Sequence, residues 1–251
     1  MKKIIFTLLA LVGTMSMNAQ VLKIYSGDQI VAAFTADQAD RYVFEKLPDP
    51  IEGSVGTAPR YDENVIGGEV DVKWVQLWED GPKFAEYNIG ATSATGYGCY
   101  YCWGGVVDRD PDAEWKYWTG DELGDNDTAT RLWGDNWRMP TRYDFLDLIN
   151  NCTCIWKENY NGTGVNGTLC TGKGDYISNS IFLPAGGFYD DQGKIGGDLN
   201  REAPGKNGFY WTSTPSGSPS AYYMYIHEVY VSGRGRSNSL SIRAVLNEED
   251  E

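Results

Sequence analysis

Few residues in this chain have the type and spacing that an enzyme requires. Any Cys-His or Ser-His-Asp arrangement would have to use the single histidine, His227. In YMYIHEVYV, the alternation of side chains predicts a strand on which Tyr225, His227 and Val229 share one face. An isolated histidine on a strand is more often structural or exposed than catalytic. We therefore expect no catalytic residue.

The five cysteines could supply other chemistry, and they stand at positions 99, 102, 152, 154 and 170. Cys99 and Cys102 have the CxxC spacing of zinc and redox sites. A zinc site would need a second such pair or two histidines. A thioredoxin-like motif should open a helix, whereas YGCYYCWGG is aromatic and strand-like. We expect this pair to be a structural bridge or to contain a buried thiol.

The positions of Cys154 and Cys170 predict a disulfide between them. They flank two strand-like runs that are nearly symmetric about Gly162, so a hairpin would place them opposite each other. Because the number of cysteines is odd, at least one thiol stays free or pairs with another molecule.

Two acidic loops resemble metal sites only in part. In DRDPDAEWKYWT, four carboxylates are spaced as in a calcium loop, but the sixth and twelfth positions hold Ala113 and Thr119 instead of Gly and Glu. GDELGDNDT is a second loop of the same kind, and GGDLNREAPGKNG lacks residues that a phosphate loop needs. We expect solvated loops, with calcium binding as the less favoured alternative, and predict no metal or cofactor.

Charge and the first residues indicate an exported chain. The net charge of −14 argues against nucleic acid and anionic membranes as partners. Arg234 and Arg236 are too few to change this and should balance nearby carboxylates. Lys2 and Lys3, the apolar run IIFTLLALV and the stretch SMNAQ predict a signal peptide over residues 1–19. The apolar run is too short for a membrane span, so we expect a soluble protein that is periplasmic, on the cell surface or secreted.

Composition divides the rest of the chain. Residues 20–45 contain short strand-like runs and are expected to form a β leader segment. Residues 46–69 hold three prolines and four glycines, which is typical of a linker. The main domain is expected over residues 70–247, followed by an acidic tail at 248–251.

Inside the main domain, short β-like runs alternate with glycine-rich turns, and one segment has a strong helix signature. Thr141 can cap this helix, Asp144 completes a capping box, and Asn150–Asn151 can end it. The apolar face of the predicted helix consists of Phe145, Leu148 and Ile149.

Five segments carry a resemblance to a known family. In chain order they are WVQLWEDGPKFAEYNIGATSATGYGCYYCWGG, WGDNWRMPTRYDFLDLINNCT, NSIFLPAGG, FYWTSTP and SIRAV. Their order and spacing, over roughly residues 74–245, resemble the Fibrobacter succinogenes major paralogous domain family, which is common in secreted proteins of Bacteroidota. The resemblance implies an α+β, C-type-lectin-like fold with twisted antiparallel strands, few short helices and long loops. It implies no known activity.

This chain departs from the family pattern at its cysteines. Cys99 and Cys102 stand where Asp and Ala are common, and Cys154 and Cys170 stand where Trp and an aliphatic residue are usual. Paired additions of this kind indicate extra cross-linking in an extracellular protein.

Two other protein groups of the same fold class have functional sites whose motifs this sequence lacks. WRMPTRYDF is similar to the RLPTEAEWE motif of the formylglycine-generating enzymes, but their catalytic cysteine pair lies near the C-terminus, and this chain has no cysteine after Cys170. The Glu-Pro-Asn or Gln-Pro-Asp and Trp-Asn-Asp motifs of calcium-dependent lectins are absent. An oxidase of the first kind is therefore the least favoured function.

Aromatic residues give the candidate binding site. We expect the tryptophans inside the family segments in the core: Trp74, Trp103, Trp133, Trp137 and Trp211. EWKYWTGDELGDND lies between these segments, so we expect Trp115, Tyr117 and Trp118 to be exposed, with Asp121 and Asp125 as polar neighbours. Packing of this loop onto the domain is the alternative.

The sequence leaves three candidate functions for this protein. The first is a secreted or cell-surface binding module, not an enzyme, that recognises glycan or protein through residues 106–130. The second is a structural or assembly component of the cell envelope, whose N-terminal strands add to the sheet edge of a partner. The oxidase is the third.

Overall fold

The computed structural model describes residues 21–26, 29–35, 47–63, 68–108, 116–196 and 202–247. The chain divides into two compact units, residues 1–45 and residues 46–251. The predicted signal peptide (1–19) and acidic tail (248–251) lie outside the described residues. In the first unit, β1 (Val21–Ser26) and β2 (Gln29–Thr35) form an antiparallel hairpin within the segment that we expected to be a β leader.

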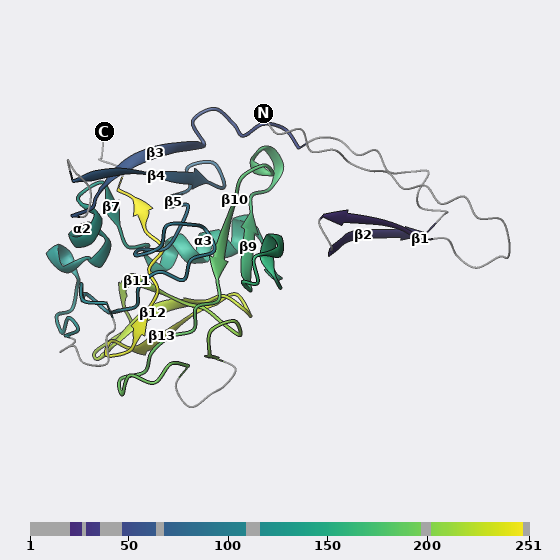
Figure 1. Ribbon diagram of the computed structural model, residues 1–251. Helices are drawn as coiled ribbons and strands as arrows, with labels where there is room; N and C mark the ends of the chain where they lie inside the picture. Colours follow the sequence, from purple (N-terminus) through teal and green to yellow (C-terminus); the bar gives the residue numbers. More distant parts are fainter. Residues whose placement is uncertain are drawn as a thin grey trace, which may run out of the picture. The chain divides into compact units, whose positions relative to one another are not determined.

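The second unit is α+β and consists mostly of short strands. Its largest sheet is antiparallel, with the strand order β3-β4-β5-β15-β7 (Figure 1). These strands are β3 (Val55–Tyr61), β4 (Glu69–Gln76), β5 (Lys83–Ala85), β15 (Val245–Leu246) and β7 (Trp137–Arg138). The last strand in the described residues, β15, thus pairs between the two earlier strands β5 and β7.

Three smaller antiparallel sheets complete the unit. One contains β8 (Thr153–Lys157), β9 (Gly167–Thr171) and β10 (Ser180–Pro184); another contains β11 (Phe209–Pro215), β12 (Ser220–Tyr225) and β13 (Tyr230–Gly235); and the third pairs β6 (Tyr101–Cys102) with β14 (Ser239–Leu240). Three short 3-10 helices lie between strands: η1 (Gly124–Asn126), η2 (Tyr160–Gly162) and η3 (Gly174–Tyr176).

The prediction that residues 46–69 form a linker is wrong in part. Its residues 55–61 form β3, which pairs along its whole length with β4. Gly56 permits this pairing, because a Cβ there would lie 2.5 Å from the Trp74 ring. Pro59 is compatible with β3 because this is an edge strand of the sheet, where a missing N–H is tolerated. This segment belongs to the second unit.

The predicted helix is confirmed as α3 (Arg142–Asn151). Thr141 and Asp144 form the reciprocal capping box, and Phe145 and Leu148 are fully buried. The sequence did not predict a second helix, α2 (Thr128–Trp133), which has six residues and is capped by Asp127.

The predicted disulfide between Cys154 and Cys170 is also present. The two residues are directly opposite each other in the β8–β9 pair. The strand assignment of His227 is wrong, because β12 ends at Tyr225 and the following four residues form the turn to β13. His227 is exposed in this turn, with its ring centroid 4.4 Å from that of Trp156.

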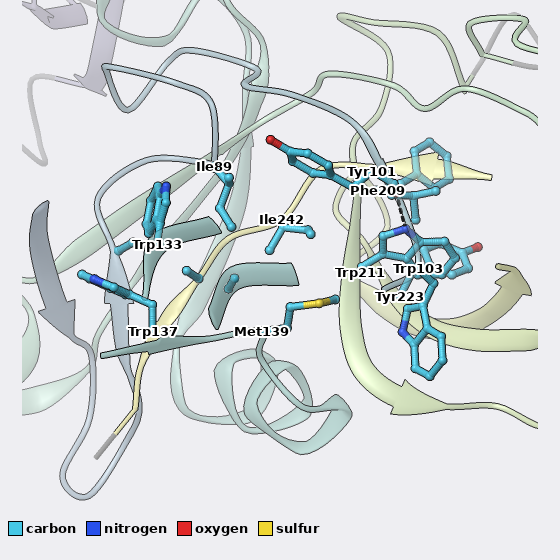
Figure 2. Packing of buried hydrophobic residues seen from close by; sticks show 14 of the residues in the cluster. Ile89, Tyr101, Trp103, Trp133, Trp137, Met139, Phe209, Trp211, Tyr223 and Ile242 are labelled. Atoms are coloured by element: carbon cyan, nitrogen blue, oxygen red, sulfur yellow. Dashed lines mark hydrogen bonds between the residues drawn. The ribbon is translucent and has the colours of Figure 1, made fainter. Parts of the chain in front are cut away.

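Tryptophans fill the core of the second unit as predicted. Trp103, Trp137 and Trp211 are fully buried and Trp133 nearly so, whereas Trp74 is only partly buried. Figure 2 shows Trp133 and Trp137 at one end of this cluster and Trp103 and Trp211 at the other. Each fully buried indole N–H donates to a backbone carbonyl, at 2.8 Å for Trp103 and Trp211 and at 2.9 Å for Trp137. The rings therefore bury apolar area without leaving a donor unsatisfied.

Arg234 balances a carboxylate, as the sequence predicted. Its Nη2 lies 3.3 Å from a carboxylate oxygen of Glu202, and its guanidinium stacks 3.9 Å from the centroid of Phe188. The ion pair and the ring together hold β13 against the segment that contains Phe188.

Arg243 is completely buried and joins several segments. Its Nε donates to Oδ1 of Asn88 (2.9 Å), and Nη1 donates to the carbonyls of Ala85 (3.0 Å) and Glu86 (2.8 Å). Its Nη2 donates to the carbonyl of Phe182 (2.9 Å) in β10. Burial lowers its pKa to about 10, so it stays charged at neutral pH. This side chain connects the end of β5 with β10 and with the segment before β15, to which Arg243 itself belongs.

We expect Arg243→Met to cost about 3–5 kcal/mol of unfolding free energy, because it leaves four acceptors, most of them buried, without their donor. The measurement is denaturant unfolding of both proteins. Arg142→Met is the control, since this guanidinium stacks 4.3 Å from the centroid of Tyr222 and should cost only about 1 kcal/mol. Equal losses for the two variants would contradict the role given to Arg243.

Candidate functional site

Trp118 is held in one position although its residue is 36% exposed. Its backbone N–H donates to the carbonyl of Trp103 (2.8 Å), and its indole N–H donates to the carbonyl of Glu122 (2.6 Å). Its own carbonyl accepts from Nη1 of Arg236 (3.3 Å). Gly104, at φ 72°, approaches so closely that a Cβ there would lie 2.5 Å from the Cβ of Trp118. The position of the ring is thus fixed by backbone contacts to the core.

Arg236 supports the turn that carries Trp118. Its Nε donates to the carbonyl of Ser220 (3.0 Å), its Nη1 donates to that of Gly120 (2.6 Å), and its guanidinium stacks 4.0 Å from the centroid of Trp103. Burial lowers its pKa, and the charge of Asp121 acts in the opposite direction. The sequence predicted that Arg236 balances carboxylates, but its hydrogen bonds go to backbone carbonyls.

A hollow of about 260 Å³ lies beside Trp118, and we name it the Trp118 depression. Tyr117, 39% exposed, contributes a second aromatic side chain to its wall. Polar groups come from Asn126, which ends η1, and from Arg131 of α2. The residues that line it are Gly104, Gly105, Val106, Val107, Lys116, Tyr117, Trp118, Asn126 and Arg131.

The structure brings together only part of the predicted site. Tyr117 and Trp118 line the same hollow and are exposed, as expected. Asp121 and Asp125 are exposed but do not line it. Trp115 lies outside the described residues.

Sequence reasoning missed Arg131 because it missed α2, and it missed Asn126, which ends η1 directly before the cap of this helix. The signal was present in Asp127, a good N-cap residue directly before TATRLW. Asp127 is buried rather than solvated in an acidic loop: its Oδ1 accepts from the backbone N–H groups of Ala129 (2.9 Å) and Met139 (3.0 Å). Burial raises its pKa, while these backbone donors act to lower it. By fixing the start of α2, Asp127 also fixes both polar lining residues.

The remaining cysteines carry reduced thiols. Cys102 is buried, with its Sγ 3.3 Å from the carbonyl of Ser237, so of the two expected alternatives the CxxC pair contains a buried thiol and no bridge. Burial raises the pKa of Cys152 to about 12 and, together with Asp108, that of Cys99 to about 11. Cys99 and Cys152 therefore lack the lowered pKa of a nucleophilic cysteine. Across the described ranges, no three His, Cys, Asp or Glu side chains gather as a metal site would need.

Comparisons with family models, curated proteins and solved structures gave no match for this chain. In the part of the chain that the structure describes, no helix has the length and apolar character to span a membrane. The depression beside Trp118 must therefore be interpreted from its own geometry.

Alkylation of Cys99 provides a test of its environment. With the pKa raised to about 11, the thiolate fraction should grow about tenfold per pH unit from pH 7 to 9 and continue to rise beyond pH 9, because only the thiolate reacts. The measurement is iodoacetamide labelling at each pH, with the Cys99 peptide quantified by mass spectrometry. Free glutathione is the control and should level off near pH 9; a Cys99 rate that levels off with it would contradict the raised pKa.

Proposed function

We propose that the protein is an exported, non-catalytic binding module with a C-type-lectin-like fold, and that it recognises a glycan through the Trp118 depression. The observation that carries this proposal is the pair of exposed aromatic residues, Tyr117 and Trp118, in one hollow with an amide and a guanidinium. Aromatic side chains suit a ligand that is apolar on one face and polar at its edges, as a sugar ring is.

The rigidity of Trp118 supports binding rather than packing alone. Immobilising a mobile side chain on association costs roughly 0.5–1.5 kcal/mol, and a ring that is already held avoids this cost. Trp118 is held by hydrogen bonds to Trp103, Glu122 and Arg236 before any ligand arrives. Such preorganised aromatic anchors are typical of recognition surfaces.

The hydrogen-bonding groups suit sugar hydroxyls. The Asn126 side chain can donate and accept, and its Nδ2 makes one 3.2 Å hydrogen bond to the carbonyl of Leu123. Arg131 uses Nη1 for a 3.2 Å hydrogen bond to the carbonyl of Gly104. The remaining donors of its guanidinium can reach a ligand. The Cys154–Cys170 disulfide supports an exported location, since disulfides persist in oxidising compartments.

We expect Trp118→Ala to weaken glycan binding about tenfold or more, because truncating a central aromatic anchor typically costs about 2 kcal/mol. Binding of the full chain to a glycan array, followed by titration of the best ligand, is the measurement. Tyr143→Ala is the matched control, since Tyr143 is 64% exposed on α3 and does not line the depression. Array binding that survives in Trp118→Ala, or no glycan bound at all, would refute this function.

A second candidate function rests on the N-terminal hairpin. An isolated two-stranded hairpin is marginally stable in water, and β1 and β2 form a unit separate from residues 46–251. We propose, as the alternative, that this hairpin adds to a sheet edge in a partner of the cell envelope and makes the protein an assembly component.

Deletion of residues 20–46 should then abolish co-sedimentation with envelope fractions while the second unit stays folded. Circular dichroism and thermal unfolding of the deleted chain serve as the folding control. If the deleted chain still co-sediments, the hairpin is not the attachment point and the assembly role is lost.

A further inference from the structure

A second hollow adjoins the first and shares Arg131 with it. It has a volume of about 530 Å³, and we name it the Trp133 depression. The residues that line it are Arg60, Tyr61, Asp62, Glu63, Ile89, Gly90, Ala91, Thr92, Cys99, Tyr101, Arg131, Leu132 and Trp133. Arg131 therefore stands at the junction of two neighbouring hollows of the second unit.

Size favours a ligand that occupies both hollows. Pockets for compact organic ligands usually measure about 300–1,000 Å³. The Trp118 depression, at 260 Å³, falls below this range, whereas the Trp133 depression, at 530 Å³, lies within it. Each hollow also presents an exposed aromatic residue, Trp118 in one and Tyr61 (57% exposed) in the other. Two adjoining subsites of this kind suit consecutive sugar units of one chain.

A basic side chain lies at the junction of the two hollows. The chain carries 35 acidic and 21 basic residues, yet Arg131 is exposed here and has no carboxylate partner within the described residues. Arg60, in contrast, is neutralised by Asp62 at 2.9 Å. Salt at 0.15 M screens charges beyond about 8 Å, so acidic residues farther away than this act only weakly at the junction. Asp62 and Glu63 also line the Trp133 depression, so the anionic group of a ligand is expected at Arg131 and not beside them.

We propose that the glycan site takes an acidic oligosaccharide that spans both depressions and places an anionic group, a uronate carboxylate or a sulfate ester, on Arg131. This inference rests on the proposed function and adds the ligand class. The planar guanidinium donates two parallel hydrogen bonds to such a group, and charge-assisted bonds of this type are about twice as strong as neutral ones. Arg131 would thus select acidic glycans, while the aromatic residues supply affinity for the sugar rings.

The test uses the full chain and paired probes that differ only in charge. The first pair is tetragalacturonate and its methyl ester, and the second pair is a sulfated chondroitin tetrasaccharide and its desulfated form. We expect the acidic member of one pair to bind at least about tenfold more tightly than its partner, and Arg131→Gln to remove this difference. Lys206→Gln is the charge-matched control, because Lys206 is exposed and lines neither depression. The pair that shows the difference identifies the source of the anionic group.

Tyr61→Ala tests whether the two hollows act together. It should weaken binding of the acidic tetrasaccharide about fivefold or more and leave the corresponding disaccharide within twofold, because only the longer chain reaches both subsites. Equal effects on the two lengths, or none, would overturn the spanning arrangement.

The outcomes separate this inference from the function on which it rests. If Trp118→Ala abolishes glycan binding but Arg131→Gln does not change the preference between charged and neutral probes, the acidic ligand class is wrong and the binding module stands. If no oligosaccharide binds in a way that depends on Trp118, both are wrong.

Discussion

A buried guanidinium with backbone carbonyls as partners is the interaction on which the second unit depends. Arg243 donates to three carbonyls and to Asn88, whose Nδ2 donates in turn to the carbonyl of Tyr97 (2.9 Å) and to the hydroxyl of Tyr210 (3.3 Å). The hydroxyl of Tyr210 donates a hydrogen bond to the carbonyl of Pro184 (2.7 Å). Burying a charge is costly unless every donor is satisfied. The strands that supply these carbonyls must therefore be in place together.

Local signals were enough to predict the parts of the fold that depend on neighbours in sequence. The capping box of Thr141 and Asp144 needs only three intervening positions, and the Cys154–Cys170 pair needs only a symmetric turn. The strand β3 could not be predicted, because it exists through its pairing with β4 and composition alone resembled a linker. The burial of Arg243 was equally hidden, since nothing near it in sequence shows which carbonyls the fold collects around it.

The candidate site was also predicted only in part. The exposure of Trp118 follows from its place in a polar insertion between recognisable segments, and the structure supports that reasoning. Its rigidity depends on Arg236, which is more than a hundred residues away in sequence and was expected only to balance charge. Arg131 was missed because α2 is too short to show a periodic apolar face, and its cap, Asp127, resembled one more solvated carboxylate. Long-range support of this kind leaves no local pattern.

The backbone carbonyls that surround Arg243 affect how the fold responds to acid. Carbonyl oxygens do not become protonated in mildly acidic media, so acidification leaves this central charge with all its partners. Asp127 has a similar effect. Because its pKa is raised in the folded chain, the folded chain binds a proton more readily than the unfolded chain. Uptake of that proton as the pH falls therefore favours the folded state. Two buried ionisable groups of this framework, Arg243 and Asp127, thus do not lower the stability of the fold as the pH falls.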